Sequence, residues 1–333
     1  MKGAASEPRL FLYRLRFNIA LSYCRFGNAI TLEMQYRVAT LMSLRLRSRV
    51  ELGLLARLLF LFFFLFPIIA NAQQRWLSVT PAPALPAQTS GGYVDRKDAL
   101  LWYATFGDDK KPAVLLLHGG GGNSNTWGHL IRDLMRDYRV VVFDCRGQGR
   151  STNDAPAISY EQMAQDAIAV LGQLGIEKAA VVGWSDGANI GFYLALRQPQ
   201  RITALVAFAG NATPAGYQPN SNPATMAAYA AATRAEYQWL SPHPKKFSEV
   251  FQLLTAMWKS QPTLTNDELA AIKARTVILH AEHDEIIRRA HSQELAKQIP
   301  NAKFILLRGV SHFAPLQNPN GFNASVRAFL VAR

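Results

Sequence analysis

The pentapeptide Gly183-Trp184-Ser185-Asp186-Gly187 constrains this chain more than any other feature of its sequence. It directly follows the apolar run 179–182 and opens a helical stretch. A serine between two glycines at such a junction is typical of a sharp turn from a strand into a helix, where side chains at the glycine positions would clash. Such a turn presents the hydroxyl at the carboxyl end of a sheet, where ligands bind in open α/β folds. Ser185 is therefore the candidate nucleophile.

Strands and helices are predicted to alternate from about residue 91 onward, because short β-branched or apolar runs alternate there with amphipathic segments. The predicted strands are residues 93–96, 100–105, 113–117, 139–143, 179–182, 204–208, 276–280 and 303–307. The first two would form an antiparallel edge. The others would form a mostly parallel sheet flanked by helices such as residues 160–174. The expected fold class is therefore α/β with an eight-stranded, mostly parallel sheet.

One interval is too long for a simple connection between a strand and a helix. More than sixty residues separate the strand ending near Phe208 from the strand starting at Thr276. Helical segments are predicted within it at residues 224–240, 245–258 and 266–274, with prolines between them. We expect residues 211–274 to form a helical lid inserted over the sheet, which would shape the substrate pocket.

A glycine run follows the predicted strand 113–117, in the sequence His118-Gly119-Gly120-Gly121-Gly122-Asn123. Backbone N–H groups in such a run can approach a substrate closely. They predict an oxyanion hole with Gly120 N–H and Asp186 N–H as its donors. A phosphate-binding loop is the alternative. The run lacks G-x-x-x-x-G-K-[ST] and departs from the spacing of G-x-G-x-x-G, which favours the oxyanion hole.

A third motif, Asp144-Cys145-Arg146-Gly147-Gln148-Gly149-Arg150-Ser151, follows the predicted strand 139–143, although Asp144 and Arg146 could equally be structural. His-Gly-Gly, Asp-x-Arg-Gly-x-Gly-x-Ser and Gly-x-Ser-x-Gly in this order resemble the α/β-hydrolase superfamily. Within it, the chain resembles lidded serine hydrolases similar to biphenyl hydrolase-like proteins, enol-lactonases and C–C bond hydrolases. The resemblance covers residues 91–331. It implies an acid after the strand that follows the lid, and a histidine after the last strand.

Both implied residues are present in that order. Asp284 ends a segment similar to the family's strand and G-x-x-D, with Ala281 in place of the usual glycine. His312 ends Gly309-Val310-Ser311-His312, which matches the family's G-x-x-H loop. The resemblance therefore implies a triad in which Ser185 attacks, His312 is the general base and Asp284 orients it.

Other residues compete for two of these roles. Glu282 and Glu285 lie near enough to Asp284 to replace it as the acid. Asp284 could instead cap a helix over residues 285–297, and His312 could be an ordinary surface histidine. Three other histidines fit the Ser, Asp, His order less well: His118, His280 and His283.

The triad predicts acyl transfer without a cofactor, on a small-molecule substrate. A carboxylic ester is the favoured substrate, with a lactone, peroxyacid chemistry or an amide as alternatives on the same triad. Dehalogenases and epoxide hydrolases of the superfamily are excluded by the resemblance, because they use a carboxylate at the position of Ser185. A ligand-binding protein of the same fold with a silent triad stays open as a different class.

Substrate contacts are predicted for the residues that flank the triad, Trp184, Asp186 and Phe313. For Asp186 there are two interpretations. Its carboxylate could favour the start of the helix through the helix dipole, or it could pair with a cationic or hydroxylated group of the substrate. Four lid aromatics could line an apolar pocket or pack in the core: Tyr237, Trp239, Phe251 and Trp258.

The chain carries a net charge of +13, which could indicate binding to nucleic acid or to an acidic membrane. Residues 1–72 hold ten basic and three acidic residues, and therefore +7 of this charge. The remaining +6 is scattered, without a basic block, so no nucleic-acid partner is expected.

Cys24 and Cys145 are the only cysteines, and the histidines do not cluster at metal-ligand spacings, so no metal site is expected.

The first 72 residues are predicted to be a leader. Residues 58–69 form an apolar run that is short for a membrane span of about 20 residues but has the length of a signal-peptide core. Arginines precede it, and Ala70-Asn71-Ala72 follows as a cleavage site. We therefore expect four parts: residues 1–41 as an extra or mis-assigned segment, 42–72 as a signal peptide, 73–90 as a proline-rich linker and 91–333 as the hydrolase domain.

Cleavage after Ala72 would place the protein in the periplasm or outside the cell. The alternatives are an uncleaved leader, the only membrane contact expected, or an N-terminal helix packed on the enzyme. Expression in a Gram-negative host should yield an exported soluble protein that starts at Gln73, which N-terminal sequencing can measure. Retention of residues 1–41 would contradict this prediction.

Overall fold

The protein is described by a computed structural model over residues 75–219 and 221–332. The predicted extra segment 1–41 and signal peptide 42–72 lie outside the described residues. Of the predicted linker, residues 75–90 are described. They contain one short 3-10 helix, η1 (Arg75–Leu77), followed by irregular chain up to the first strand. Within the described ranges, no helix is long and apolar enough to span a membrane.

The centre of the fold is a single sheet of eight strands. In chain order they are β1 (Ser90–Arg96), β2 (Ala99–Phe106), β3 (Ala113–Leu117), β4 (Arg139–Phe143), β5 (Ala179–Trp184), β6 (Ile202–Phe208), β7 (Arg275–His283) and β8 (Lys303–Ser311). Their order across the sheet is β1-β2-β4-β3-β5-β6-β7-β8. β2 runs antiparallel to both its neighbours, and every later pairing is parallel. The predicted α/β class and eight-stranded, mostly parallel sheet are confirmed.

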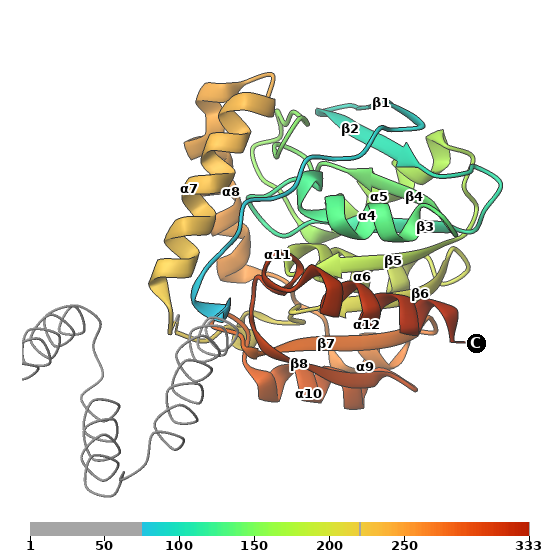
Figure 1. Ribbon diagram of the computed structural model, residues 1–333, viewed down its shortest axis with the longest axis vertical. Coiled ribbons are helices and arrows are strands. Elements are labelled where there is room, and N and C mark those ends of the chain that lie inside the picture. Colours follow the sequence, from blue (N-terminus) through green and yellow to red (C-terminus); the bar gives the residue numbers. More distant parts are fainter. Residues whose placement is uncertain (1–74, 220, 333) are drawn as a thin grey trace, which may run out of the picture. The chain divides into compact units, whose positions relative to one another are not determined.

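Helices and 3-10 helices connect the strands. They are η2 (Ser124–Trp127), α4 (Gly128–Leu134), α5 (Tyr160–Gln173), α6 (Asp186–Arg197), η3 (Pro214–Gly216), α7 (Pro223–Leu240), η4 (Pro244–Lys246), α8 (Phe247–Ser260), α9 (Asn266–Ala270), α10 (Arg289–Gln298), α11 (Ala314–Gln317) and α12 (Pro319–Val331). α4 and α12 cover one face of the sheet, and α5 and α6 cover the other (Figure 1).

Two apolar clusters, one on each face of the sheet, form the core. Alternate side chains of a strand belong to different clusters, as in β4, where Val140 and Val142 belong to one and Val141 and Phe143 to the other. All four side chains are fully buried. Strands covered on both faces therefore read as continuous apolar runs, which is why they were recognisable in the sequence.

The long interval between β6 and β7 contains two long helices, α7 and α8. They lie side by side at one end of the sheet (Figure 1). The third predicted segment, residues 266–274, is helical only over α9, which packs against α6 and α10 beside the sheet. We call α7 and α8 together the lid helices.

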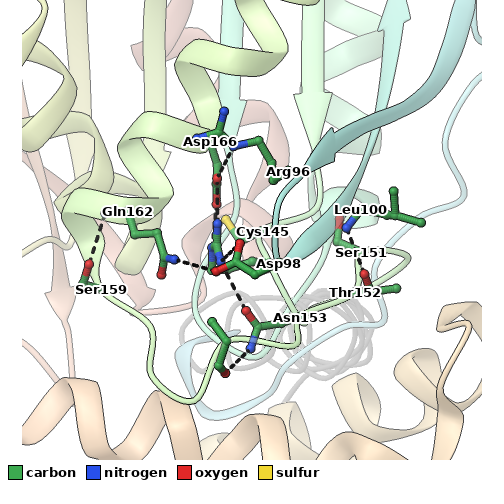
Figure 2. Close-up of polar contacts among 12 residues, drawn as sticks. Arg96, Asp98, Leu100, Cys145, Ser151, Thr152, Asn153, Ser159, Gln162 and Asp166 are labelled. Carbon is green, nitrogen blue, oxygen red and sulfur yellow. Dashed lines mark hydrogen bonds and ion pairs between the residues drawn. The ribbon is translucent and has the colours of Figure 1, made fainter.

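The turn after β4 contains a buried ion-pair cluster. Arg146 donates to both carboxylate oxygens of Asp166, at 2.7 and 2.8 Å, and to Asp98 at 3.1 Å. Arg96 also donates to Asp166, at 3.2 Å, and the two lie side by side in Figure 2. The side chains of Arg146 and Asp166 are 1% and 0% exposed. The cluster therefore ties the turn after β4 to α5 and to the chain between β1 and β2.

Replacing Arg146 by alanine should destabilise the fold strongly, because it leaves the buried carboxylate of Asp166 with a single cationic partner. We expect the free energy of unfolding to fall by about 3 kcal/mol. Urea unfolding followed by circular dichroism measures this. The control is Arg197→Ala, whose ion pairs with Glu161 and Glu268 are largely exposed and should contribute less than about 1 kcal/mol. Equal effects of the two substitutions would contradict the prediction.

Candidate active site

Ser185 lies at a strained turn between β5 and α6. Its φ of 55° and ψ of −118° fall outside the regions that most residues occupy. The turn is closely packed: a Cβ at Gly183 would lie 2.2 Å from the Gly187 carbonyl oxygen, and a Cβ at Gly187 would lie 2.0 Å from that of Leu117. Ser185 N–H donates to Phe208 O of the neighbouring β6 at 2.8 Å. The two glycines of the motif are therefore required by backbone contacts.

Asp284 and His312 meet at the ends of neighbouring strands. Asp284 follows β7 and His312 follows β8, which pair in parallel. His312 Nδ1 lies 3.1 Å from each oxygen of the Asp284 carboxylate, and the two side chains are 4% and 0% exposed. An ionised carboxylate can only accept, so Nδ1 carries the proton and leaves Nε2 as an acceptor. This pair can orient an imidazole for proton transfer.

The turn that contains Asp284 also fixes its carboxylate. Oδ1 accepts hydrogen bonds from Ile286 N–H at 3.0 Å and Ile287 N–H at 2.8 Å. The alternative in which Asp284 caps a helix over residues 285–297 is wrong, because α10 begins only at Arg289. The bonds to Ile286 and Ile287 hold these residues in a non-helical turn.

Burial and the mutual charge of the pair act on both pKa values in opposite ways. Burial alone would raise the pKa of Asp284, but the charge and the hydrogen bond of His312 outweigh it and lower that pKa. Burial alone would lower the pKa of His312, but the charge and hydrogen bond of Asp284, with Glu285 and Asp186 beyond, raise it. The pair therefore favours an ionised acid beside a basic imidazole.

Trp184 joins the Ser185 turn to the His312 loop. Its indole N–H donates to the His312 carbonyl oxygen at 2.8 Å, and its ring packs edge-on against Phe313. Among the described residues, no hydrogen bond connects Ser185 Oγ with the His312 imidazole. The structure thus brings Asp284 and His312 into contact and holds the Ser185 turn and the His312 loop together through a neighbouring side chain.

The glycine loop lies against the same turn. A Cβ at Gly119 would be 3.5 Å from Ser185 Cβ. Gly121 N–H is occupied by Gln148 Oε1 at 2.7 Å. Gly120 N–H and Asp186 N–H, by contrast, have no acceptor among the described residues, and both stay available for an oxyanion. Their role as the oxyanion hole stays a prediction.

His118 holds two backbone segments together, the glycine loop and the turn after β4. Its Nε2 accepts from Cys145 N–H at 3.0 Å, and Nδ1 lies 2.8 Å from Gly119 O. One nitrogen accepts and the other donates, which is the pattern of a neutral imidazole. Burial lowers the pKa of His118, in agreement with that state.

Asp186 is held by two donors from outside its own helix. Its carboxylate accepts from the Tyr160 hydroxyl of α5 at 2.7 Å and from the Trp258 indole N–H of the lid helix α8 at 2.9 and 3.0 Å. Only 5% of Asp186 is exposed. Burial raises its pKa to about 6, against the opposing effects of Trp258, Tyr160 and His312. Asp186 thus connects the Ser185 turn to the lid helix α8, a role beyond the two interpretations drawn from the sequence.

Glu285 is a functional candidate that sequence reasoning considered only as a replacement for Asp284. It is 1% exposed, and its Oε2 accepts from His312 N–H at 2.9 Å. Its Oε1 accepts from the Thr225 hydroxyl in the first turn of α7 at 2.6 Å. Glu282, the other competitor, accepts from Gly309 N–H. Of these three acids, Glu282 in β7 and Asp284 and Glu285 in the turn after it, Asp284 alone contacts the imidazole.

The remaining predicted substrate contacts are buried or exposed to different degrees. Trp184 and Phe313 are each 1% exposed and belong to the core on the α4 face, so substrate contact stays a prediction for them. In the lid, Trp258 reaches Asp186 and packs edge-on against Phe251, whereas Trp239 is 88% exposed.

Within the described ranges, no group of three or more His, Cys, Asp or Glu residues could hold a metal ion.

The sequence matches a profile of the alpha/beta hydrolase fold over residues 112–237, which contains Ser185 and the glycine loop but ends before Asp284. Curated relatives carry the name carbamate hydrolase RutD. The protein from Pseudomonas savastanoi pv. phaseolicola is 26% identical over 67% of this chain and 95% of its own length. That from Caulobacter segnis is 28% identical over 66% of this chain and 91% of its own length.

Solved structures share the fold. Est816, described as an N-acyl homoserine lactone degrading enzyme, aligns with a TM-score of 0.62 at 26% identity, over 72% of this chain and all of its own. The enol-lactonase from Burkholderia xenovorans LB400 aligns at 0.58 and 22% identity, over 72% of this chain and all of its own. Together with the sheet order, these matches show that the chain belongs to the α/β-hydrolase superfamily.

Replacing Asp186 by asparagine should stabilise the protein above pH 6. The unfolded chain releases this proton near pH 3.8, whereas the folded protein keeps it up to about pH 6. Stability is therefore lost as the pH rises between these values, by up to about 3 kcal/mol. Asparagine avoids this loss, and its one carbonyl oxygen can still accept from both Tyr160 and Trp258, as Asp186 Oδ1 does.

Thermal unfolding of both proteins at pH 4 and pH 7.5 tests this prediction. The variant should gain stability at pH 7.5 and gain little at pH 4. Asp109→Asn, on an exposed loop, is the control and should change stability equally at both pH values. A variant that is less stable than the original at pH 7.5 would refute the argument.

Proposed function

We propose that this hydrolase cleaves a carboxylic ester of a small molecule through an acyl-enzyme intermediate formed on Ser185. The observation that carries the proposal is the buried contact between Asp284 and His312 Nδ1, at 3.1 Å, in a loop that Trp184 joins to the strained turn of Ser185. Each element of the triad comes from a different strand end of the same sheet. A carboxylate, an imidazole and a serine hydroxyl are the parts of an activated nucleophile.

The proposed reaction starts when His312 Nε2 takes the proton of Ser185 Oγ as this oxygen attacks the carbonyl carbon. Asp284 keeps the proton on Nδ1 and stabilises the imidazolium that forms. Gly120 N–H and Asp186 N–H donate to the oxyanion. His312 then gives its proton to the leaving alcohol. In the second half of the reaction, a water molecule attacks the acyl-enzyme while His312 takes its proton, and His312 returns this proton to Ser185 Oγ as the acid is released.

An ester is the favoured substrate class, and lactone, peroxyacid and amide chemistry use the same groups. The names of similar proteins include a carbamate hydrolase and an N-acyl homoserine lactone degrading enzyme. A substrate panel for this chain should therefore contain simple esters, lactones and carbamates. The lid helices, with Trp258 and Phe251 near the nucleophile turn and the glycine loop, support a small and largely apolar acyl group.

We also propose that the enzyme works in the periplasm or outside the cell, after removal of residues 1–72. The support is the apolar run 58–69 and its following Ala-Asn-Ala. Export favours a substrate available outside the cytosol over an intermediate of cytosolic catabolism.

Replacing Ser185 by alanine should abolish turnover of the best substrate in the panel, by a factor on the order of 10⁶. The same substitution should abolish labelling by a fluorophosphonate probe, which reacts only with an activated serine. The control is Ser260→Ala, at the exposed end of α8, which should keep both activity and labelling.

Two results would contradict the proposal in different ways. Activity above a few per cent in Ser185→Ala would remove Ser185 as the nucleophile. Failure of the folded original protein to react with the probe would favour a ligand-binding protein with a silent triad.

A further inference from the structure

We propose that Glu285 is a positioning residue that couples the lid to the general base, by holding the His312 backbone and the first turn of α7 with one carboxylate. The inference rests on the proposed role of His312. It concerns a residue outside the triad and the oxyanion hole, and it gives the lid a direct connection to the catalytic histidine.

The first observation is the geometry of the carboxylate. Oε2 accepts from His312 N–H at 2.9 Å, and Oε1 accepts from Thr225 Oγ1 at 2.6 Å. Thr225 Oγ1 also lies 2.8 Å from Asn222 O, but a hydroxyl has one proton, and the shorter contact to a carboxylate is the stronger. Glu285 and Thr225 are each 1% exposed. Both contacts therefore form away from water, where hydrogen bonds to a charged group are strong.

The second observation is the position of Glu285 in the turn after β7. Asp284 binds the imidazole of His312, while the next residue binds its backbone. Two consecutive acids thus fix both the ring and the main chain of one histidine. A neutral side chain could accept the backbone N–H equally well, and a buried carboxylate is costly. The choice of a carboxylate here is explained if its charge also serves the histidine.

The charges around His312 support this explanation. It is faced by Asp284 and Glu285 from the turn after β7, by Asp186 from α6, and by His280 from β7. Glu285 is among the groups that raise the pKa of His312, after Asp284. A second negative charge would stabilise the imidazolium that forms while Ser185 attacks.

The hydrogen bond from Thr225 connects Glu285 to the lid helix α7. α7 begins at Pro223, so Thr225 lies in its first turn. A movement of this end of α7 away from the sheet would break the contact with Glu285. The position of the lid and the alignment of His312 are therefore coupled through one side chain.

The central test is Glu285→Gln. Glutamine can still accept from His312 N–H through Oε1 and donate to the Thr225 hydroxyl through Nε2, so the local geometry is kept and the charge is lost. We expect kcat to fall about tenfold. We also expect the acidic limb of the kcat/KM profile to move to lower pH, because the charge of Glu285 is among the groups that raise the pKa of His312.

A second readout does not depend on activity. NMR titration of the His312 ring is performed in the inactive Ser185→Ala protein, with and without Glu285→Gln. The titration should move to lower pH when the charge is removed. The matched control is Glu282→Gln, near the end of β7, whose carboxylate accepts from Gly309 N–H and not from His312. It should leave both the pH profile and the titration unchanged.

Two further variants separate the effect of the Glu285 charge from the effect of its hydrogen bonds. Glu285→Asp keeps the charge but shortens the side chain, so the acidic limb should stay near its original pH while kcat falls. Thr225→Val removes the hydroxyl from the lid, so KM should change severalfold while the His312 titration stays in place.

The proposal is overturned if Glu285→Gln and Glu282→Gln give the same pH profile and the same His312 titration. It is also overturned if Glu285→Gln and Thr225→Val leave kcat and KM unchanged. Retained activity in Ser185→Ala would instead reject the proposed nucleophile, and the NMR titration would still decide the effect of Glu285 on His312.

Discussion

The close approach of the first turn of α6 to β3 is the constraint on which the site depends. A Cβ at Gly187 would lie 2.0 Å from Leu117 O, so only glycine allows this contact. The contact fixes Ser185 beside the end of β3, where the glycine loop begins. Because β3 and β5 pair in parallel, their carboxyl ends deliver the loop and the serine to the same edge of the sheet. The strain at Ser185 is maintained by this packing.

A second level of organisation comes from polar contacts between the lid helices and the loops of the site. Trp258 of α8 binds Asp186, and Thr225 of α7 binds Glu285. Further along α7, Glu236 accepts from Asn123, which ends the glycine run. Each contact pairs a carboxylate with a donor on the other part. The lid helices therefore contact the Ser185 turn, the glycine loop and the turn after β7 separately, and their placement is coupled to all three.

The sequence predicted the parts that are governed by local patterns. Strands such as β3 and β4 were predicted with correct bounds, because they are buried on both faces and are therefore continuous apolar runs. The alternative of a helix starting at residue 285 was wrong, because the Asp284 carboxylate accepts from the N–H groups of Ile286 and Ile287 and holds them in a turn. These contacts have no clear signal in the sequence. The role proposed for Glu285 was missed for the same reason, because its partner Thr225 is sixty residues away.

Two acids of the site, Asp284 and Asp186, are similarly buried but have pKa values shifted in opposite directions. Asp284 faces a group that becomes a cation, and the charge of His312 outweighs burial and lowers the pKa of Asp284. Asp186 is equally enclosed, but its donors are the neutral Tyr160 hydroxyl and Trp258 indole, and its pKa rises to about 6. The charge of Asp284 is therefore fixed at neutral pH, whereas the charge of Asp186 costs stability. A carboxylate at such a cost, one residue after Ser185, is better explained by the function of the site than by the stability of the fold.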